Sequence, residues 1–189
     1  KSDNGVSRYY DEKGRSLQKA FLKAPLAFSR ISSKFTKKRL HPIFKEYRSH
    51  PGVDYAAPKG TPIKTVGDGV IKEIGYNRGM GNYINIRHYN GYITEYNHMS
   101  KFARGMKKSK KISQGAVIGY VGRTGYATGT HLDFRMSKNG KLVDPLKHRP
   151  PLASPVKPSE MEAFRARTIE LSAKILTAQK PGSNNKKST

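Results

Sequence analysis

The sequence predicts a mainly β protein built from antiparallel strands, with one α-helix near its carboxyl end. Three observations carry this prediction. Between residues 35 and 150, glycines recur every few residues and separate short runs rich in β-branched and aromatic residues. Asn90-Gly91 lies between two such runs, which is the strongest short-range signal for a β-hairpin. Beyond residue 158, apolar residues recur at helical spacing.

The elements follow in order from a polar lead-in at residues 1–30. Asp11-Glu12-Lys13-Gly14 predicts a turn, and residues 17–30, interrupted by Pro25, predict a short strand or loop that retains residues of an upstream module. The main domain is expected at residues 31–148. Its predicted strands are 61–65, 69–76, 83–88, 92–97, 117–121 and 131–136.

A proline-rich linker at 149–158 separates this domain from a predicted helix at 159–180. The helix carries an apolar stripe, which we expect to pack on the domain itself; its members are Met161, Phe164, Thr168, Leu171 and Ile175. Residues 181–189 are expected to be disordered.

Composition excludes several classes of site. The 189 residues suffice for one compact domain with tails, and the absence of cysteine excludes disulfides, thiolate metal sites and cysteine nucleophiles. No segment reaches the roughly 18 apolar residues that span a bilayer. Because the chain begins at Lys1, we expect that any targeting signal has been removed. Its 37 Lys and Arg against 13 Asp and Glu, a net charge of +24, predict attraction to polyanions or simply a solvated basic surface.

Two short motifs combine imidazole and carboxylate groups. His50 and Asp54 are four positions apart, and the glycine between them, Gly52, allows the chain to bend so that both side chains converge. His131 and Asp133 lie in a predicted strand, so they point to the same face. Either motif alone is weak evidence for a metal site.

The other histidines are less informative. His98 ends the second strand of the predicted hairpin, and His88, beside the Asn-Gly turn, is expected to be solvated. His148 belongs to the basic linker.

Taken together, these residues resemble the lysostaphin/LytM-type zinc endopeptidases of the bacterial envelope. The resemblance runs from about residue 31 to residue 146, with its elements in the family's order. They are Arg39-Leu40-His41-Pro42-Ile43, His50-x-x-x-Asp54, Ala57-Pro58-x-Gly60-Thr61-Pro62, Gly81-Asn82-Tyr83, Tyr96-x-His98-Met99-Ser100, Gly115-x-x-Ile118-Gly119 and Thr124-Gly125-x-x-Thr128-Gly129-x-His131-Leu132.

The resemblance implies a half-open barrel or sandwich of antiparallel sheets with a catalytic groove. It also implies that His50, Asp54 and Asp133 occupy the positions of the zinc ligands. His131 then resembles the general base and His98 the stabiliser of the oxyanion, and these two roles could be exchanged. In such a site zinc polarises the scissile carbonyl and lowers the pKa of a water molecule.

Asp133 departs from the family pattern, which has a third histidine ligand at this position. A carboxylate binds zinc at about the same distance, but it is shorter and adds a negative charge, which makes the metal a weaker Lewis acid. Two alternatives follow. Either the His/Asp/Asp site is active, or the domain is catalytically degenerate and binds wall peptides or regulates another hydrolase.

The partners implied are peptidoglycan stem peptides and cross-links, with anionic wall polymers as candidates for the basic surface. We expect a monomer in the bacterial cell envelope, periplasmic or secreted. A nucleic-acid partner is not expected, because the basic residues are scattered and their main cluster, Lys107-Lys108-Ser109-Lys110-Lys111, predicts a loop.

Overall fold

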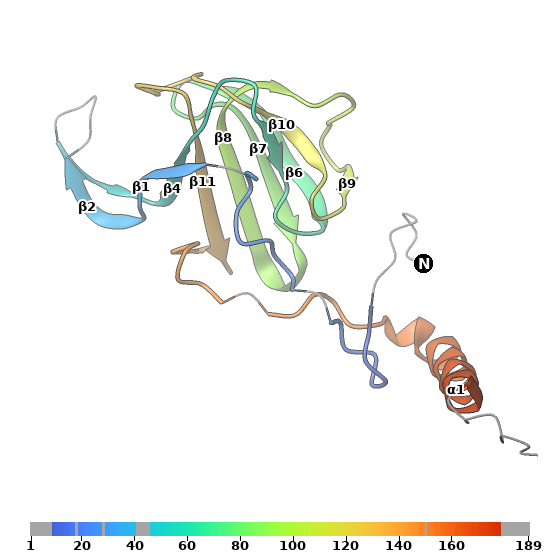
Figure 1. The fold of residues 1–189 in the computed structure, drawn as a ribbon. Coiled ribbons are helices and arrows are strands. Elements are labelled where there is room, and N and C mark those ends of the chain that lie inside the picture. The colour runs from blue at the N-terminus through green and yellow to red at the C-terminus, as the bar shows by residue number, and fades with distance from the viewer. Residues whose placement is uncertain (1–8, 18, 28, 41–45, 150, 179–189) are drawn as a thin grey trace, which may run out of the picture.

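The computed structural model describes residues 9–17, 19–27, 29–40, 46–149 and 151–178. Figure 1 shows the long strands side by side in one sheet, with α1 lying away from it. The elements are β1 (Arg30–Ser33), β2 (Thr36–Leu40), β3 (Tyr47–His50), β4 (Gly52–Ala56), β5 (Pro62–Lys64), β6 (Gly69–Asn77), β7 (Gly81–His88), η1 (Tyr89–Gly91), β8 (Tyr92–Phe102), β9 (Lys111–Ile112), β10 (Val117–Val121), β11 (His131–Lys138), β12 (Lys141–Val143), η2 (Pro158–Glu160) and α1 (Met161–Ala178).

The main sheet has ten strands and is antiparallel throughout its pairings. Its central order is β1-β4-β11-β8-β7-β6-β9, while β10 joins the end of β8 to β5, and β12 pairs with β11. β2 and β3 form a separate two-stranded sheet. The sheet does not close on itself, so the mainly β, half-open architecture with a C-terminal helix is confirmed.

The hairpin of β7 and β8 turns at the predicted dipeptide. Asn90 and Gly91 both have positive φ, 58° and 71°, as a tight turn that follows the twist of its strands requires. Strand β8 continues to Phe102, which extends the predicted element and places His98 within it.

The core cluster draws on every long strand and on β5 and β10. Its apolar side chains alternate along β11, where Leu132 and Phe134 are buried among the core residues while His131, Asp133 and Arg135 line the opposite face. The fully buried side chains include Ile63, Ile71, Ile84, Ile86, Tyr96, Met99 and Ile118.

The lead-in packs against this core. Phe21 and Leu26 are among its buried residues. The amide of Ala20 donates to the carbonyl oxygen of Pro151, and the side chain of Gln114 donates to the Ala20 carbonyl. The segment before the main domain and the segment after it therefore meet beside Gln114.

The predicted C-terminal helix is present as α1, and its apolar stripe is half-buried over the first two turns and exposed beyond them. Phe164 stacks edge-on against Tyr10, with ring centroids 5.8 Å apart, and the first turn lies beside Gly14. Leu171 and Ile175 are 45% and 58% exposed. These contacts join the first two turns of α1 to the lead-in rather than to the main domain on which we expected packing, and the rest of α1 is exposed. No described helix is both long and apolar enough to cross a membrane.

Candidate metal centre and groove

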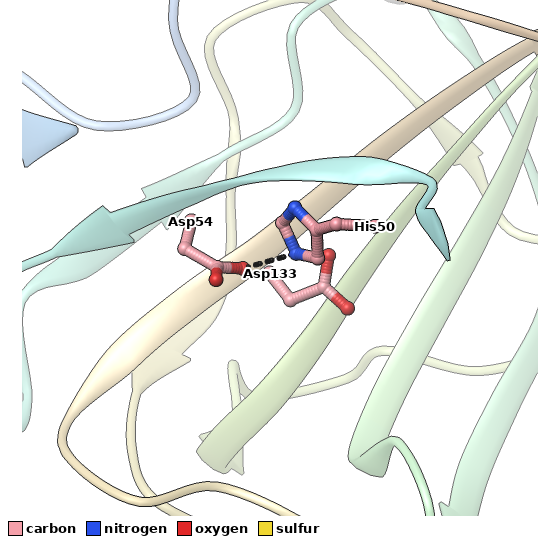
Figure 2. Close-up of side chains that lie close together, drawn as sticks. All are labelled: His50, Asp54 and Asp133. Atoms are coloured by element: carbon pink, nitrogen blue, oxygen red, sulfur yellow. Dashed lines mark hydrogen bonds and ion pairs between the residues drawn. The ribbon is translucent and has the colours of Figure 1, made fainter. Parts of the chain in front are cut away.

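Three side chains able to bind a metal converge where β3, β4 and β11 meet, as Figure 2 shows. His50 is the last residue of β3 and Asp54 lies in the middle of β4. Asp54 is the direct partner of Asp133 in the antiparallel ladder, so both carboxylates leave the same face of the sheet. One ligand atom from each of the three residues lies within 4.8 Å of the other two, and all three residues are buried.

Gly52 allows β4 to lie close to β11 at this point. A Cβ atom at Gly52 would lie 2.6 Å from Oδ1 of Asp133 and 2.7 Å from the carbonyl oxygen of Phe134. The break between β3 and β4 falls at Pro51. The glycine therefore serves the close approach to Asp133 rather than the bend that the sequence suggested.

The hydrogen bonds of His50 leave one ring nitrogen directed at a carboxylate. Nδ1 lies 3.2 Å from the carbonyl oxygen of Lys34, which can only accept, so Nδ1 carries the donated hydrogen. Nε2 lies 2.9 Å from Oδ1 of Asp54. Nε2 of His50 and Oδ1 of Asp54 can therefore either share a proton or bind one metal ion together.

Asp133 is held by two donors from neighbouring positions of the sheet. Arg135, two residues along β11, donates to Oδ2 from Nη2 at 2.7 Å and from Nε at 3.0 Å. Asn97 of β8 donates to the same oxygen at 3.2 Å. Burial by itself raises the pKa of Asp133, but the charge and hydrogen bonds of Arg135, with a smaller contribution from His50, outweigh it and leave the pKa lowered. Asp133 is therefore an ionised, oriented carboxylate.

The two remaining predicted histidines stand beside this cluster. The ring centroids of His98 and His131 are 4.8 Å apart, and Nε2 of His131 lies 3.9 Å from Oδ1 of Asp54. Nδ1 of His98 donates to the carbonyl oxygen of Thr124 at 2.7 Å, and Nδ1 of His131 donates to that of Gly129 at 2.9 Å. Each neutral ring therefore has an Nε2 lone pair available for a proton. Burial, with a smaller contribution from His131, lowers the pKa of His98 against the opposing effect of Asp133, which favours its neutral form.

His98 adopts a backbone conformation that is unusual for its residue type. Its φ is +64°, in the left-handed region, which costs a non-glycine residue about 1–3 kcal/mol. Its amide donates to the carbonyl oxygen of Met80, and its ring is bound to the glycine-rich loop that precedes β11. These contacts hold the strained residue in place at the groove.

That loop approaches the turn before β7 so closely that two positions exclude a side chain. Gly125 has φ +72°, and a Cβ atom there would lie 2.3 Å from the backbone nitrogen of Gly81. Thr124 Oγ1 accepts from the amide of Asn82 and donates to the carbonyl oxygen of Met99. The loop is thereby fixed against β7 and β8, and its carbonyl groups orient the histidines.

A groove with a volume of about 560 Å³ opens over these residues. All five predicted site residues line it, and Arg135 is a sixth ionisable residue in its wall. Its remaining lining is small, polar or aromatic and includes Ser32, Ser33, Met80, Tyr126, Thr128 and Thr130. This volume lies in the range of ligand-binding clefts, about 300–1,000 Å³.

Sequence reasoning missed Arg135 and Asn97. The signal for Arg135 was available, because residues two apart in a strand share a face, so Arg135 had to lie beside Asp133. Predicting the role of Asn97 would have required the register of β8 against β11, in which Asn97 is the partner of Asp133.

The expectation for His88 was wrong. The residue is 7% exposed, with its ring nitrogens bound to the Asp68 carbonyl oxygen and Thr94 Oγ1, because Phe21 of the lead-in packs over it. His148 bonds to Tyr92 Oη, away from the groove. His41 lies outside the described residues.

The donor set fits a divalent transition metal. One imidazole and two carboxylates are borderline-to-hard ligands that zinc accepts, and one ligand atom from each lies within 4.8 Å of the other two. Asp133 offers Oδ1 to that cation, since the two stronger donors bind Oδ2.

The chain is similar to known proteins in family, sequence and structure. The sequence model of peptidase family M23 matches residues 48–145. The chain is 41% identical over 173 residues to the peptidoglycan DD-endopeptidase ShyC of Vibrio cholerae, an alignment covering 92% of this chain and 40% of the relative. The chain thus spans about two fifths of the length of the curated relatives it matches.

Two solved structures share the fold. A zinc-containing peptidase from Vibrio cholerae is 36% identical with a TM-score of 0.66, covering 76% of this chain and 44% of that one. The catalytic domain of the antimicrobial peptidase lysostaphin from Staphylococcus simulans is 30% identical with a TM-score of 0.55, covering 62% of this chain and 90% of that domain.

Proposed function

Because the family model spans more than half of the chain, the protein belongs to peptidase family M23, and on this premise we propose that it is a zinc-dependent endopeptidase that hydrolyses peptide cross-links of bacterial peptidoglycan. The observation that carries the proposal is the convergence of three metal donors with two histidines whose Nε2 atoms are free to exchange a proton. The relative ShyC, named a peptidoglycan DD-endopeptidase, and the zinc-containing structural neighbour support it.

His50, Asp54 and Asp133 would hold the metal. When bound, zinc supplies a Lewis acid that polarises the scissile carbonyl and activates water. Nε2 of His131 lies 3.9 Å from Oδ1 of the metal-binding Asp54. His131 would therefore accept the proton of the attacking water. His98, after its Nε2 takes up a proton from solvent, would donate a hydrogen bond to the developing oxyanion. The two histidines are close enough for these roles to be exchanged.

The substrate class agrees with the shape and charge of the protein. The groove is open and polar enough for an extended peptide, so the proposed ligands are stem peptides and their cross-links. The net charge of +24 would attract anionic wall polymers. We place this activity in the bacterial cell envelope, in a monomer whose peptidase unit is residues 31–148.

One observation favours a second candidate function. Arg135 already neutralises Asp133 without a metal, as would be expected of a degenerate domain that binds wall peptides or regulates another hydrolase. The two candidates predict opposite results in one experiment.

The purified protein would be analysed for bound metal and then incubated with purified sacculi, with and without a chelator. The peptidase predicts about one zinc per chain and release of chelator-sensitive muropeptides. His131→Ala, which leaves all three metal donors in place, should retain zinc and release none. Asp133→Ala should lose zinc. Wild-type protein that binds no zinc and releases no muropeptides would refute the peptidase and favour the binding domain.

A further inference from the structure

The guanidinium of Arg135 and the metal site share one carboxylate. Arg135 and Asn97 direct their shorter hydrogen bonds to Oδ2 of Asp133, while Oδ1 accepts from Nε of Arg135 at the longer distance of 3.3 Å. One oxygen of Asp133 is therefore saturated with donors, and the other keeps its lone pairs for a metal.

Arg135 also lies near a second carboxylate. In the ladder of β11 and β8 its direct partner is Glu95, and its side chain is only 28% exposed. Both the Asp133 and Glu95 carboxylates raise the pKa of Arg135 against the effect of burial, which is the larger single influence and lowers it. The charges of Asp133 and Glu95 both favour the present position of the guanidinium.

Two buried carboxylates side by side are costly without a positive charge. Asp54 and Asp133 are 8% and 3% exposed and face each other across the β4–β11 ladder. Arg135 reduces the net charge of the set formed with His50 from −2 to −1. This is the charge of a site with two neutral imidazoles and one carboxylate.

We propose that Arg135 is a fixed counter-charge of the metal centre, and that it stays bound to Asp133 when the metal binds. It stabilises Asp133 in the metal-free protein and withdraws negative charge from the metal in the loaded one. This inference rests on the proposed zinc site. The positive charge of Arg135 offsets the additional negative charge of an aspartate at a ligand position. The metal then remains a stronger Lewis acid, because the ligands carry less net negative charge.

The sign of the effect on metal affinity follows from Coulomb repulsion. A fixed positive charge beside the site opposes a divalent cation, so removing it should tighten binding. Asp133 should keep its orientation without Arg135, because its side chain is short, Asn97 still donates to it and the ladder fixes its backbone opposite Asp54.

The test compares Arg135→Gln, which can donate a hydrogen bond but carries no charge, with Arg135→Lys, which keeps the charge but loses the planar fork. The control is Arg104→Gln, which removes an exposed positive charge that does not line the groove. Zinc affinity is measured by competition with a chromogenic chelator, and the melting temperature is measured with excess chelator.

We expect Arg135→Gln to bind zinc at least tenfold more tightly than wild type and to melt at a lower temperature without metal. Arg135→Lys should bind within about threefold of wild type, and Arg104→Gln should change neither quantity. A variant that folds only with zinc also supports the proposal, since the metal then replaces the missing charge.

Equal or weaker zinc binding by Arg135→Gln would overturn the inference while leaving the zinc site intact. Weakening in both Arg135 variants would assign Arg135 a purely geometric role and equally overturn the counter-charge. Zinc binding by none of the proteins would instead refute the proposed function.

Discussion

Replacing Asp133 by asparagine removes one charge from the centre while keeping the shape of the side chain. Arg135 would lose the carboxylate to which it donates at 2.7 Å and 3.0 Å. Removing one partner of a buried ion pair costs about 3–5 kcal/mol. Because the Arg135 side chain is 28% exposed and Glu95 lies opposite it, we expect the lower end, about 3 kcal/mol.

For a chain of this size, 1 kcal/mol corresponds to about 2–4 °C, so the melting temperature of Asp133→Asn in chelator should fall by about 6–12 °C. Since the pKa of Asp133 is lowered in the folded protein, this stabilisation is present above the unfolded value of 3.8 and is lost as the pH falls through the folded pKa. Zinc affinity should fall at least tenfold, because a neutral amide replaces an anionic ligand.

The assay is thermal unfolding in chelator followed by zinc titration. Asp144→Asn is the matched control, since Oδ1 of Asp144 accepts from the Leu146 amide in a surface loop and the asparagine keeps that oxygen. It should stay within about 0.5 kcal/mol of wild type. An Asp133→Asn protein that melts with wild type in chelator would refute the structural role of the pair, and one that binds zinc equally well would show that Asp133 is not a ligand.

Three further predictions concern the rest of the fold. Burial lowers the pKa of His88 to about 4, so its neutral form stabilises the protein above pH 6.5, and this contribution of about 3 kcal/mol is lost as the pH falls from 6.5 to 4. His88→Gln should therefore make the free energy of unfolding, measured with urea, less dependent on pH over this range. Parallel pH curves for variant and wild type would contradict this. Gly125→Ala places a Cβ atom 2.3 Å from the Gly81 nitrogen and should displace the loop that orients His98. Muropeptide release should therefore fall at least tenfold while the circular dichroism spectrum stays unchanged, and full activity would show that the loop can shift freely. Tyr96→Phe removes a buried hydroxyl bonded to backbone and side chain, and should cost about 1–2 kcal/mol in denaturant titration without altering zinc affinity, whereas a loss of zinc would link the core to the site.

The candidate site was predictable where a short segment determines which side chains lie together. His131 and Asp133 share a face because strand side chains alternate, and the order of motifs along the chain resembled a known family closely enough to add His50, Asp54 and His98. Arg135 obeys the same alternation, but its importance depends on Asp133 being buried, which the sequence does not state.

By itself, the sequence determined the mainly β fold, the hairpin at Asn90-Gly91 and the shared face of His131 and Asp133, because turn conformation and strand alternation are properties of a few consecutive residues. Only the tertiary structure decided that β4 lies between β1 and β11, that Phe21 covers His88 and that Arg135 neutralises Asp133. These outcomes depend on contacts between distant segments, in which burial and the pairing of charges are decided together.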